Sequence, residues 1–331
     1  MLKDGVNAIG LDRYSPPHTF GSTQGETRLL RTAYSEGVEF VPMVQRSLQL
    51  WKALEGEMSV NLFCQTGMLY CGLPSVQFLK DAVKAARGNP TITLRPIDLG
   101  SRPSQLVIPK DWDCLLDADA GFLKCEDAIK AFVTRAGMQA FADVKCEHIV
   151  PGSDGIVVKT KHGNIDTGKV IVTTGMWVSE LIPELAEVTS SERPFVIVIG
   201  DHMLYGFPTD EQNQVKIARH DNGEPVENPD AVDQTIKPSE IEQMSSIVAN
   251  YFPALGPYLR GSVCVYPKAR QDTFIVGALP WDLRIVVGAG LSGHGFKFAP
   301  FIGESVATIA QDQEPRVDID ILSVQRALAR H

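Results

Sequence analysis

The sequence has no apolar run as long as the roughly 20 residues that a membrane-spanning helix needs. It begins with MLKDG, which lacks the apolar core of a secretion signal. Positive charge is in deficit, because 31 Lys and Arg stand against 40 Asp and Glu and the net charge is −9. A basic face for nucleic acids or anionic membranes is therefore not expected. We expect a cytoplasmic protein that binds neither.

Cysteine is sparse and dispersed. The chain has 6 cysteines, with no C-x-x-C pair and no Cys/His group at zinc-binding spacing, so no metal site is expected. In a chain without a secretion signal, we expect reduced thiols that are mostly buried. The composition is otherwise ordinary for a globular protein, with 44% hydrophobic and 21% charged residues.

Hydrophobic periodicity predicts both helices and strands. Amphipathic helices are expected over 39–54, 75–87, 125–137, 237–252 and 301–311. A β-hairpin is expected from 155 to 175 with its turn at 162–164, and a further strand over 262–269. Helices and strands alternate in some stretches and segregate in others. This order predicts an α/β nucleotide-binding part interleaved with an antiparallel α+β part.

The stretch RIVVGAGLSGHGFKFAP (284–300) contains a formal G-x-G-x-x-G that ends at Gly293. A dinucleotide-binding fingerprint needs a complete βαβ unit after it, and the remaining 38 residues offer one helix and an irregular tail. We therefore expect that this turn does not bind ADP. Its glycines would allow close approach to a flat ligand, and the following helix start, beside His294 and Lys297, favours an anion.

Five separated motifs resemble, in the same order, the monomeric sarcosine oxidase and N-methyltryptophan oxidase family of flavin-dependent amine oxidases. The motifs are PPHTFGSTQGETRLLRTAYSEG (16–37), YGFP (205–208), VKIARH (215–220), RGSVCVY (260–266) and GLSGHGFKF (290–298). The resemblance implies an α/β fold, in which an FAD-binding Rossmann-like domain of the glutathione-reductase type is interleaved with an antiparallel α+β substrate domain. It assigns 1–67, 122–188 and 270–331 to the first domain, and 68–121 and 189–269 to the second.

The resemblance also implies roles for individual residues. Cys264 matches the cysteine that bonds covalently to the flavin ring methyl, for which a thiolate is a suitable nucleophile. Lys216 matches the lysine that activates oxygen, where a fixed positive charge stabilises superoxide as it forms. Arg31 and Lys297 match the pair that clamps the substrate carboxylate and orients the N-methyl carbon toward the flavin.

Other residues of the motifs match the lining of the same site. Arg28, His220 and Tyr205 match catalytic residues, and Tyr266 matches a substrate-binding residue. Asp12 matches the acid that accepts the ribose hydroxyls of the adenosine. The remaining expected contacts with FAD are Val144, Gly175, Gly290, Gly293, His294, Gly295 and Lys297.

The sequence departs from the family pattern in two places. The family places its own G-x-G-x-x-G turn near the N-terminus, and here Met1 aligns near the end of the helix that follows that turn. We therefore expect an N-terminally truncated FAD-binding domain with reduced affinity for FAD. A second gap is expected between Glu187 and Pro194, where the family has a strand. We hypothesise that both departures from the family pattern result from an incomplete gene model or a skipped exon.

The function expected from the resemblance is oxidation of N-methyl amino acids by FAD, held covalently through Cys264. The partners are a secondary amine that carries a carboxylate and molecular oxygen, and the products are formaldehyde, the demethylated amine and hydrogen peroxide. The protein is expected to be a monomer. Two alternatives stay open: an inactive remnant that does not hold FAD, and a flavin oxidase of another amine, such as pipecolate or a fructosyl amino acid.

Overall fold

The computed structural model describes residues 6–98, 107–137, 140–185, 189–192, 198–199, 202–207, 214–219, 226 and 228–329. Its helices are α1 (Phe40–Met58), α2 (Gln77–Arg87), α3 (Cys125–Ala136), α4 (Val178–Leu181), α5 (Pro238–Tyr251), α6 (Ala299–Ile309) and α7 (Val324–Leu328). Its strands are β1 (Gly10–Leu11), β2 (Thr27–Leu30), β3 (Phe63–Cys64), β4 (Met68–Gly72), β5 (Leu94–Pro96), β6 (Asp113–Asp117), β7 (Gly121–Lys124), β8 (Ala140–Phe141), β9 (Cys146–Pro151), β10 (Ile156–Thr160), β11 (Gly163–Thr167), β12 (Val170–Val172), β13 (Thr189–Glu192), β14 (Val198–Ile199), β15 (His202–Phe207), β16 (Lys216–Arg219), β17 (Tyr266–Ala269), β18 (Ile275–Leu279) and β19 (Asp282–Ala289).

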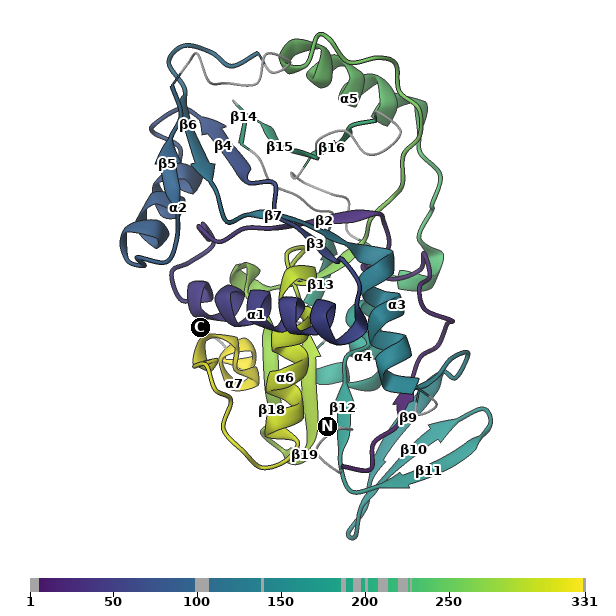
Figure 1. Cartoon of the computed structure of the whole chain (residues 1–331). Helices are drawn as coiled ribbons and strands as arrows, with labels where there is room; N and C mark the ends of the chain where they lie inside the picture. The colour runs from purple at the N-terminus through teal and green to yellow at the C-terminus, as the bar shows by residue number, and fades with distance from the viewer. Residues whose placement is uncertain are drawn as a thin grey trace.

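The lower half of the molecule in Figure 1 is built on the sheet β12-β19-β18, with α6 and α1 beside it. Strand β12 runs parallel to β19, and β18 runs antiparallel to it. Ile285, Val286 and Val287 are consecutive on β19 and all buried, as expected of a strand that is covered on both faces. Helix α6 contacts β18 and β19 and also packs on α1.

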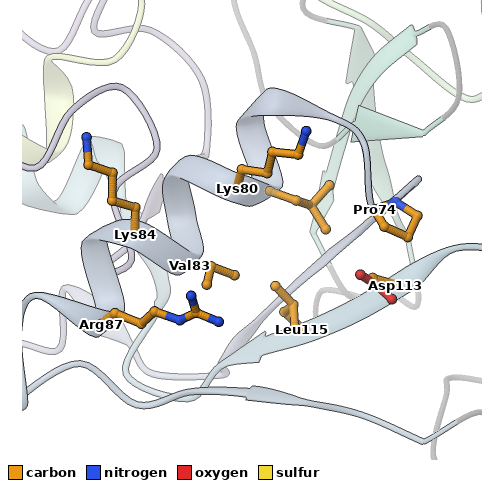
Figure 2. A pocket seen from close by; sticks show the side chains of 8 residues that line it. Pro74, Lys80, Val83, Lys84, Arg87, Asp113 and Leu115 are labelled. Atoms are coloured by element: carbon orange, nitrogen blue, oxygen red, sulfur yellow. The ribbon is translucent and has the colours of Figure 1, made fainter.

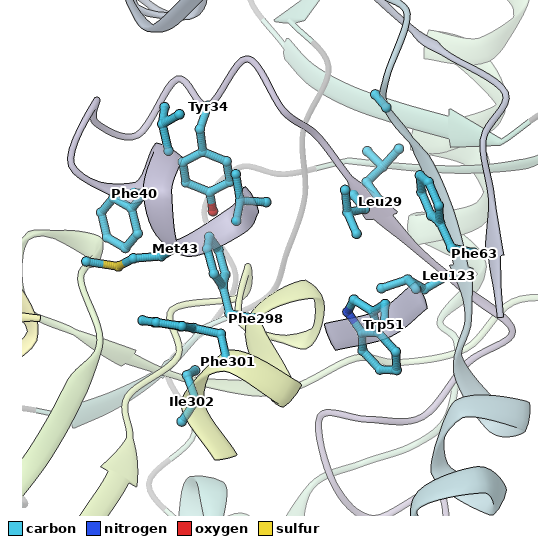
Figure 3. Close-up of a cluster of buried hydrophobic side chains, with 14 of the residues drawn as sticks. Leu29, Tyr34, Phe40, Met43, Trp51, Phe63, Leu123, Phe298, Phe301 and Ile302 are labelled. Atoms are coloured by element: carbon cyan, nitrogen blue, oxygen red, sulfur yellow. The ribbon is translucent and has the colours of Figure 1, made fainter. Parts of the chain in front are cut away.

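Helix α1 provides much of the main hydrophobic core. Its buried residues Phe40, Val44 and Trp51 recur at helical spacing, so one stripe of the helix faces inward. Figure 3 shows Trp51 near Leu123 of β7 at one end of the core and Phe40 near Phe298 at the other. The core therefore joins α1, β7 and the segment that leads into α6.

The upper half contains the sheet β4-β6-β5 with α2 on one side, the sheet β14-β15-β16, and α5 (Figure 1). The pairs within these two sheets are antiparallel. A third sheet, β2-β7-β3, lies between the halves. Gly121 on β7 is required there, because an added Cβ would lie 2.0 Å from the carbonyl oxygen of Cys64. The mixed sheet β12-β19-β18 below and the antiparallel sheets above agree with the predicted combination of an α/β part and an antiparallel part.

The expected helices are confirmed as α1, α2, α3, α5 and α6, with ends that differ by a few residues. Gly137 ends α3 with φ of 62°, which supports its predicted role as the C-cap. The hairpin prediction was wrong at its end. Strand β11 stops at Thr167, and Val170–Val172 instead form β12, which pairs with β19 of another sheet.

The strand expected over 262–269 begins only at Tyr266, which pairs with Glu192 at the end of β13, so Cys264 lies outside it. Strand β13 lies between Glu187 and Pro194, where the sequence departs from the family pattern. The other residues of that stretch lie outside the described residues. Among the helices that the structure describes, none is long and apolar enough to cross a membrane.

Candidate functional site

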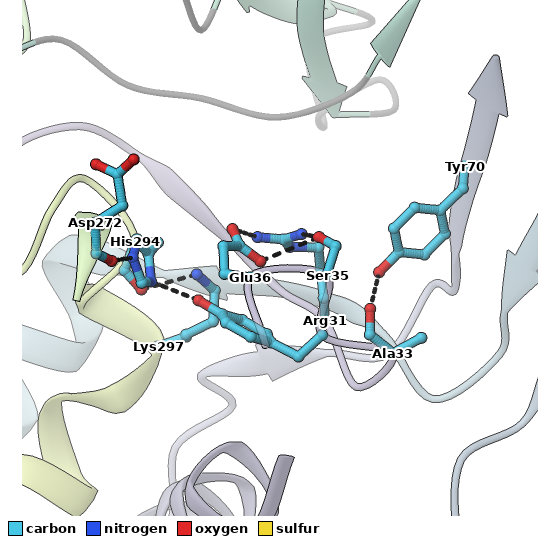
Figure 4. Close-up of polar contacts among 9 residues, drawn as sticks. Arg31, Ala33, Ser35, Glu36, Tyr70, Asp272, His294 and Lys297 are labelled. Carbon is cyan, nitrogen blue, oxygen red and sulfur yellow. Dashed lines mark hydrogen bonds and ion pairs between the residues drawn. The ribbon is translucent and has the colours of Figure 1, made fainter. Parts of the chain in front are cut away.

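The loop that follows β2 is held in place by the sheet β4-β6-β5. Asp117, at the end of β6, is fully buried and accepts hydrogen bonds from the Thr32 N–H at 2.8 Å, the Thr32 hydroxyl at 2.7 Å and the Ala33 N–H at 2.9 Å. Tyr70 of β4 donates to the Ala33 carbonyl at 2.6 Å (Figure 4). These four bonds fix the backbone on which Arg31 stands.

Arg31 is buried, with 1% of its side chain exposed. One terminal nitrogen donates to the Ser35 hydroxyl at 2.8 Å, and the other pairs with Glu36 at 2.5 Å (Figure 4). The Nε–H of Arg31 is buried and has no hydrogen-bond partner among the residues that the structure describes. A buried guanidinium donor without an acceptor is costly, so an acceptor that reached this N–H would be stabilised.

Lys297 lies on the short 3₁₀ turn Phe296–Phe298 that leads into α6. Helix α1 holds this turn, because the Ser47 hydroxyl and the Trp51 indole N–H both donate to the Lys297 carbonyl. The Lys297 ammonium donates to the His294 carbonyl at 2.8 Å and lies 5.5 Å from the centroid of the Tyr34 ring. Lys297 therefore belongs to the same buried cluster as Arg31.

His294 is an uncharged member of that cluster. Its Nε2 faces the Asp272 carbonyl at 2.8 Å, and a carbonyl can only accept, so Nε2 carries the proton. Its Nδ1 then accepts from the Tyr34 hydroxyl at 2.5 Å. Burial lowers the pKa of His294 to about 3, and the ring is uncharged at neutral pH.

The Arg31 cluster contains more positive than negative groups. Burial alone would raise the pKa of Glu36, but Arg31, His294 and Lys297 lower it to about 2, so Glu36 is a carboxylate. Burial, with help from Arg31, lowers the pKa of Lys297 to about 7. Burial opposes the charge of Arg31, but Glu36 keeps the arginine pKa raised. When Lys297 is protonated, two cations face one anion, and one further negative charge would balance the cluster.

A second group of functional candidates surrounds Arg28 on β2. Arg28 is buried and donates to the carbonyls of Thr27 at 3.0 Å, Ser22 at 3.3 Å and Gln24. Its guanidinium also lies 3.9 Å from the sulfur of Cys264. The Gln24 amide donates to the Val263 carbonyl, which anchors the segment that carries Cys264. The predicted attachment cysteine and a buried arginine are thus neighbours.

Lys216 stands at the start of β16 and donates to the Thr27 carbonyl at 3.2 Å. Burial, followed by repulsion from Arg28, lowers the pKa of Lys216 to about 8. Its ammonium lies 6.0 Å from the Tyr205 ring centroid, and burial raises the pKa of Tyr205. Of the predicted catalytic residues, Lys216, Arg28 and Tyr205 are brought together, and His220 lies outside the described residues.

The glycine-rich turn after β19 is shaped by packing. Gly290 and Gly293 have φ of +59° and +72°, and a Cβ on Gly293 would lie 2.6 Å from the ring of Tyr266. A Cβ on Gly295 would lie 2.3 Å from Leu291. Tyr266, predicted to bind substrate, is buried against this turn. Close packing with β17 therefore already requires glycine at Gly293, whatever ligand the turn contacts.

The predicted adenosine contact Asp12 and two other predicted FAD contacts, Val144 and Gly175, lie at strand ends in the lower half. Strands β1 and β8 are parallel, and the Val144 N–H donates to the Asp12 carbonyl at 2.8 Å just beyond them. The Asp12 carboxylate is 44% exposed. Gly175 follows β12 with φ of +58° and open space where a Cβ would be. The carboxyl ends of parallel strands are where α/β sheets bind ligands.

Sequence reasoning missed Glu36, Asp117 and Tyr34. Glu36 lies within the same motif as Arg31, and an acid five residues after a predicted anion-binding arginine was the available signal. A pocket of about 380 Å³ lies elsewhere, between α2 and β6, and is lined in part by Lys80, Val83 and Leu115 (Figure 2). It contains none of the predicted site residues, so we do not place the active site there.

Comparison with known proteins decides the family. The family described as FAD dependent oxidoreductase matches residues 1–309. The chain belongs to this family. N-methyl-L-tryptophan oxidase of Yersinia pestis (strain Pestoides F) is 32% identical over 346 residues, which cover 97% of this chain and 93% of the relative. The resemblance read from the motifs is confirmed.

Solved structures confirm the fold class of this FAD-dependent oxidoreductase. NikD, described as an unusual amino acid oxidase essential for nikkomycin biosynthesis, superposes with a TM-score of 0.79 at 21% identity, covering 95% of this chain and 90% of NikD. Glycine oxidase from Geobacillus kaustophilus gives 0.77 at 15% identity, covering 97% and 91%. These likenesses establish the architecture of the chain.

The residues of this oxidoreductase fit FAD at both ends. The exposed carboxylate of Asp12, beside Val144, can accept hydrogen bonds from hydroxyl groups. The open space at Gly175 admits a ligand close to the backbone. At the other end, Cys264 and Lys216 both lie close to Arg28, and the two cations favour an electron-rich ring.

Proposed function

We propose that the protein is an FAD-dependent oxidase of N-methyl amino acids, of the sarcosine or N-methyltryptophan type. The reaction consumes the N-methyl amine, oxygen and water, and yields the demethylated amine, formaldehyde and hydrogen peroxide. Bound FAD supplies the hydride acceptor and reduces oxygen. The observation that carries the proposal is the unpartnered, buried Nε–H of Arg31 beside Lys297, which forms a receptor for one carboxylate.

The substrate carboxylate binds between Arg31 and Lys297 in this proposal. Glu36 already neutralises one positive charge, so the cluster with a bound monocarboxylate has two cations and two anions. A second substrate carboxylate would leave an excess of negative charge in a buried site, which is expensive. Glu36 therefore limits the substrate to amines that bear one carboxylate.

Lys216 acts in the oxygen half of the reaction. Its buried ammonium is held by the Thr27 carbonyl and lies near the aromatic rings of Tyr205 and Phe207, so it is positioned before oxygen arrives. A preorganised cation stabilises negative charge that develops on oxygen. Arg28 places a second cation beside Cys264, which we propose as the covalent attachment point of FAD.

Further parts of the proposal rest on the family pattern. His220 and Tyr205 contribute to catalysis, and Tyr266 lines the substrate site. Gly290, Gly293, His294 and Gly295 lie along the cofactor, with Asp12, Val144 and Gly175 at its adenosine end. The division into an FAD-binding domain (1–67, 122–188 and 270–331) and a substrate domain (68–121 and 189–269) is part of the same proposal, as are a cytoplasmic location and a monomeric state.

The test combines a cofactor assay with a substrate screen. Acid precipitation of the purified chain should leave yellow flavin in the pellet, whereas flavin in the supernatant would exclude attachment through Cys264. The screen should then detect equimolar formaldehyde and hydrogen peroxide from sarcosine or N-methyltryptophan. Turnover of pipecolate or a fructosyl amino acid alone would favour another amine oxidase. A colourless protein without activity would identify an inactive remnant.

A further inference from the structure

Two cysteines lie opposite each other on adjacent strands of the sheet β4-β6-β5, outside the proposed active site. Cys71 on β4 is paired in register with Cys114 on β6, and their sulfur atoms are 3.0 Å apart. Both are buried, with exposed fractions of 2% and 4%, in an apolar cluster with Trp112, Leu204 and Ile247. The two sulfurs are therefore close together, and no disulfide joins them in the structure.

The hydrogen-bond pattern shows which kind of cross-strand pair this is. The Ile97 N–H, just after β5, donates to the Cys114 carbonyl at 2.9 Å. Because the N–H and C=O of one strand residue point to the same side, Cys114 directs both groups toward β5 and away from β4. Cys71 and Cys114 thus form a non-hydrogen-bonded pair, in which the Cα atoms are about 4.5 Å apart. This separation lies within the range that a disulfide spans.

We propose that Cys71 and Cys114 form a redox-sensitive dithiol that hydrogen peroxide oxidises to an intrachain disulfide. One thiolate attacks a peroxide oxygen, the O–O bond breaks, and a sulfenic acid and water result. The second thiol attacks the sulfenic sulfur, the S–O bond breaks, and a second water leaves as the S–S bond forms. Two thiols and one peroxide thus become one disulfide and two waters.

The disulfide would tie together the two strands that hold the Arg31 loop. Successive residues of a strand face opposite sides, so Tyr70 and Asp117 project from the face opposite to the cysteines. Tyr70 and Asp117 are the residues that bind the loop at Thr32 and Ala33. Cross-linking β4 to β6 one residue from Tyr70 therefore stabilises the relative position of the two anchors.

The experiment treats the full-length protein with added hydrogen peroxide, so it does not depend on the proposed amine oxidase activity. After quenching, the protein is unfolded, alkylated and digested without reduction for mass spectrometry. We expect a cross-linked peptide pair that contains Cys71 and Cys114, lighter by two hydrogens than the sum of its parts. The urea midpoint of the oxidised protein should also exceed that of the reduced protein, since a cross-link restricts the unfolded chain.

Two variants separate this outcome from general oxidation. In Cys71→Ala, the cross-linked pair and the rise of the midpoint should both be lost, whereas Cys146→Ala, at the more exposed cysteine of β9, should retain both. If Cys71 and Cys114 of the wild-type protein stay fully alkylatable while Cys146 is oxidised, the proposal is overturned. Separate sulfinic acids on the two cysteines would overturn it equally.

Discussion

The two buried cation clusters, around Arg31 and around Arg28, start three residues apart on the same segment and differ in how their charge is balanced. Arg31 and Lys297 share the carboxylate of Glu36. The hydrogen bonds described for Arg28 and Lys216 to oxygen go to main-chain carbonyls. The first cluster thus contains its own carboxylate before any ligand binds, whereas main-chain carbonyls hold the cations of the second.

This difference corresponds to two kinds of chemistry. A compensated cluster with one free donor binds a stable anion, such as a carboxylate, and can exist without it. Cations held by main-chain carbonyls favour a group that becomes negative nearby, such as reduced oxygen or an electron-rich ring. The five predictions that follow test this assignment, from the largest expected effect to the smallest.

Lys216→Met should affect the oxygen step most. Removing a preorganised cation from a site of developing negative charge lowers the rate by about 10²–10³-fold. Stopped-flow measurement of reaction with oxygen, after anaerobic reduction by substrate, should show this loss with little change in the anaerobic phase. Lys130→Met, at an exposed lysine of α3, is the control. An equal loss in both phases would contradict the assignment of Lys216 to oxygen.

Arg31→Met should instead reduce substrate capture. A charged hydrogen bond contributes about 1.5–3 kcal/mol, so kcat/KM should fall by about 10–150-fold. The thermal midpoint should fall too, because Glu36 loses its partner. In the double variant Arg31→Met/Glu36→Gln, stability should recover but substrate capture should not. Recovery of both would show that Arg31 serves the fold alone.

The pH dependence of kcat/KM should follow Lys297, whose pKa is about 7 in the free protein. As pH rises through this value, Lys297 loses the charge that attracts the carboxylate, so kcat/KM should fall by up to about tenfold per pH unit. Lys297→Arg should move this break to higher pH, because arginine stays protonated. A break that stays near 7 in that variant would assign the titration to another group.

The same pKa shift predicts how stability changes with pH. The unfolded chain holds the Lys297 proton up to its ordinary pKa of 10.5, and the folded chain releases it near 7. Between these values the unfolded state binds more protons, so this residue makes unfolding less favourable as pH rises. Urea unfolding of the wild-type protein and of Lys297→Met at several pH values in this window checks the sign.

Tyr34→Phe should have the smallest effect on activity. The change removes the hydroxyl that donates to His294 Nδ1 and leaves that buried nitrogen without a donor, which costs about 1–3 kcal/mol of stability. The neutral His294 carries no charge for the substrate, so KM should change little. Tyr258→Phe, at a tyrosine that is 47% exposed, should leave the urea midpoint unchanged. A large rise of KM in Tyr34→Phe would place Tyr34 in contact with substrate.

Much of this protein could be predicted from its sequence. Helical spacing located α1, because Phe40, Val44 and Trp51 repeat on one face whatever the helix packs against. The family motifs placed Arg28, Arg31 and Lys297 among the functional candidates. The sequence pattern did not predict the pairing of Val170–Val172 correctly. An apolar triplet is equally compatible with the end of a hairpin and with a strand of another sheet.

The sequence by itself determined the kinds of charge, the helical stripes and the motifs that mark the family, since these depend on residue identity and short spacing. Only the tertiary structure decided that Glu36 neutralises Arg31, that Asp117 and Tyr70 anchor its loop, and that Cys71 meets Cys114. The physical reason is that burial and pairing set the energy of a charge or a thiol. The partners that provide them are up to 85 residues away along the chain.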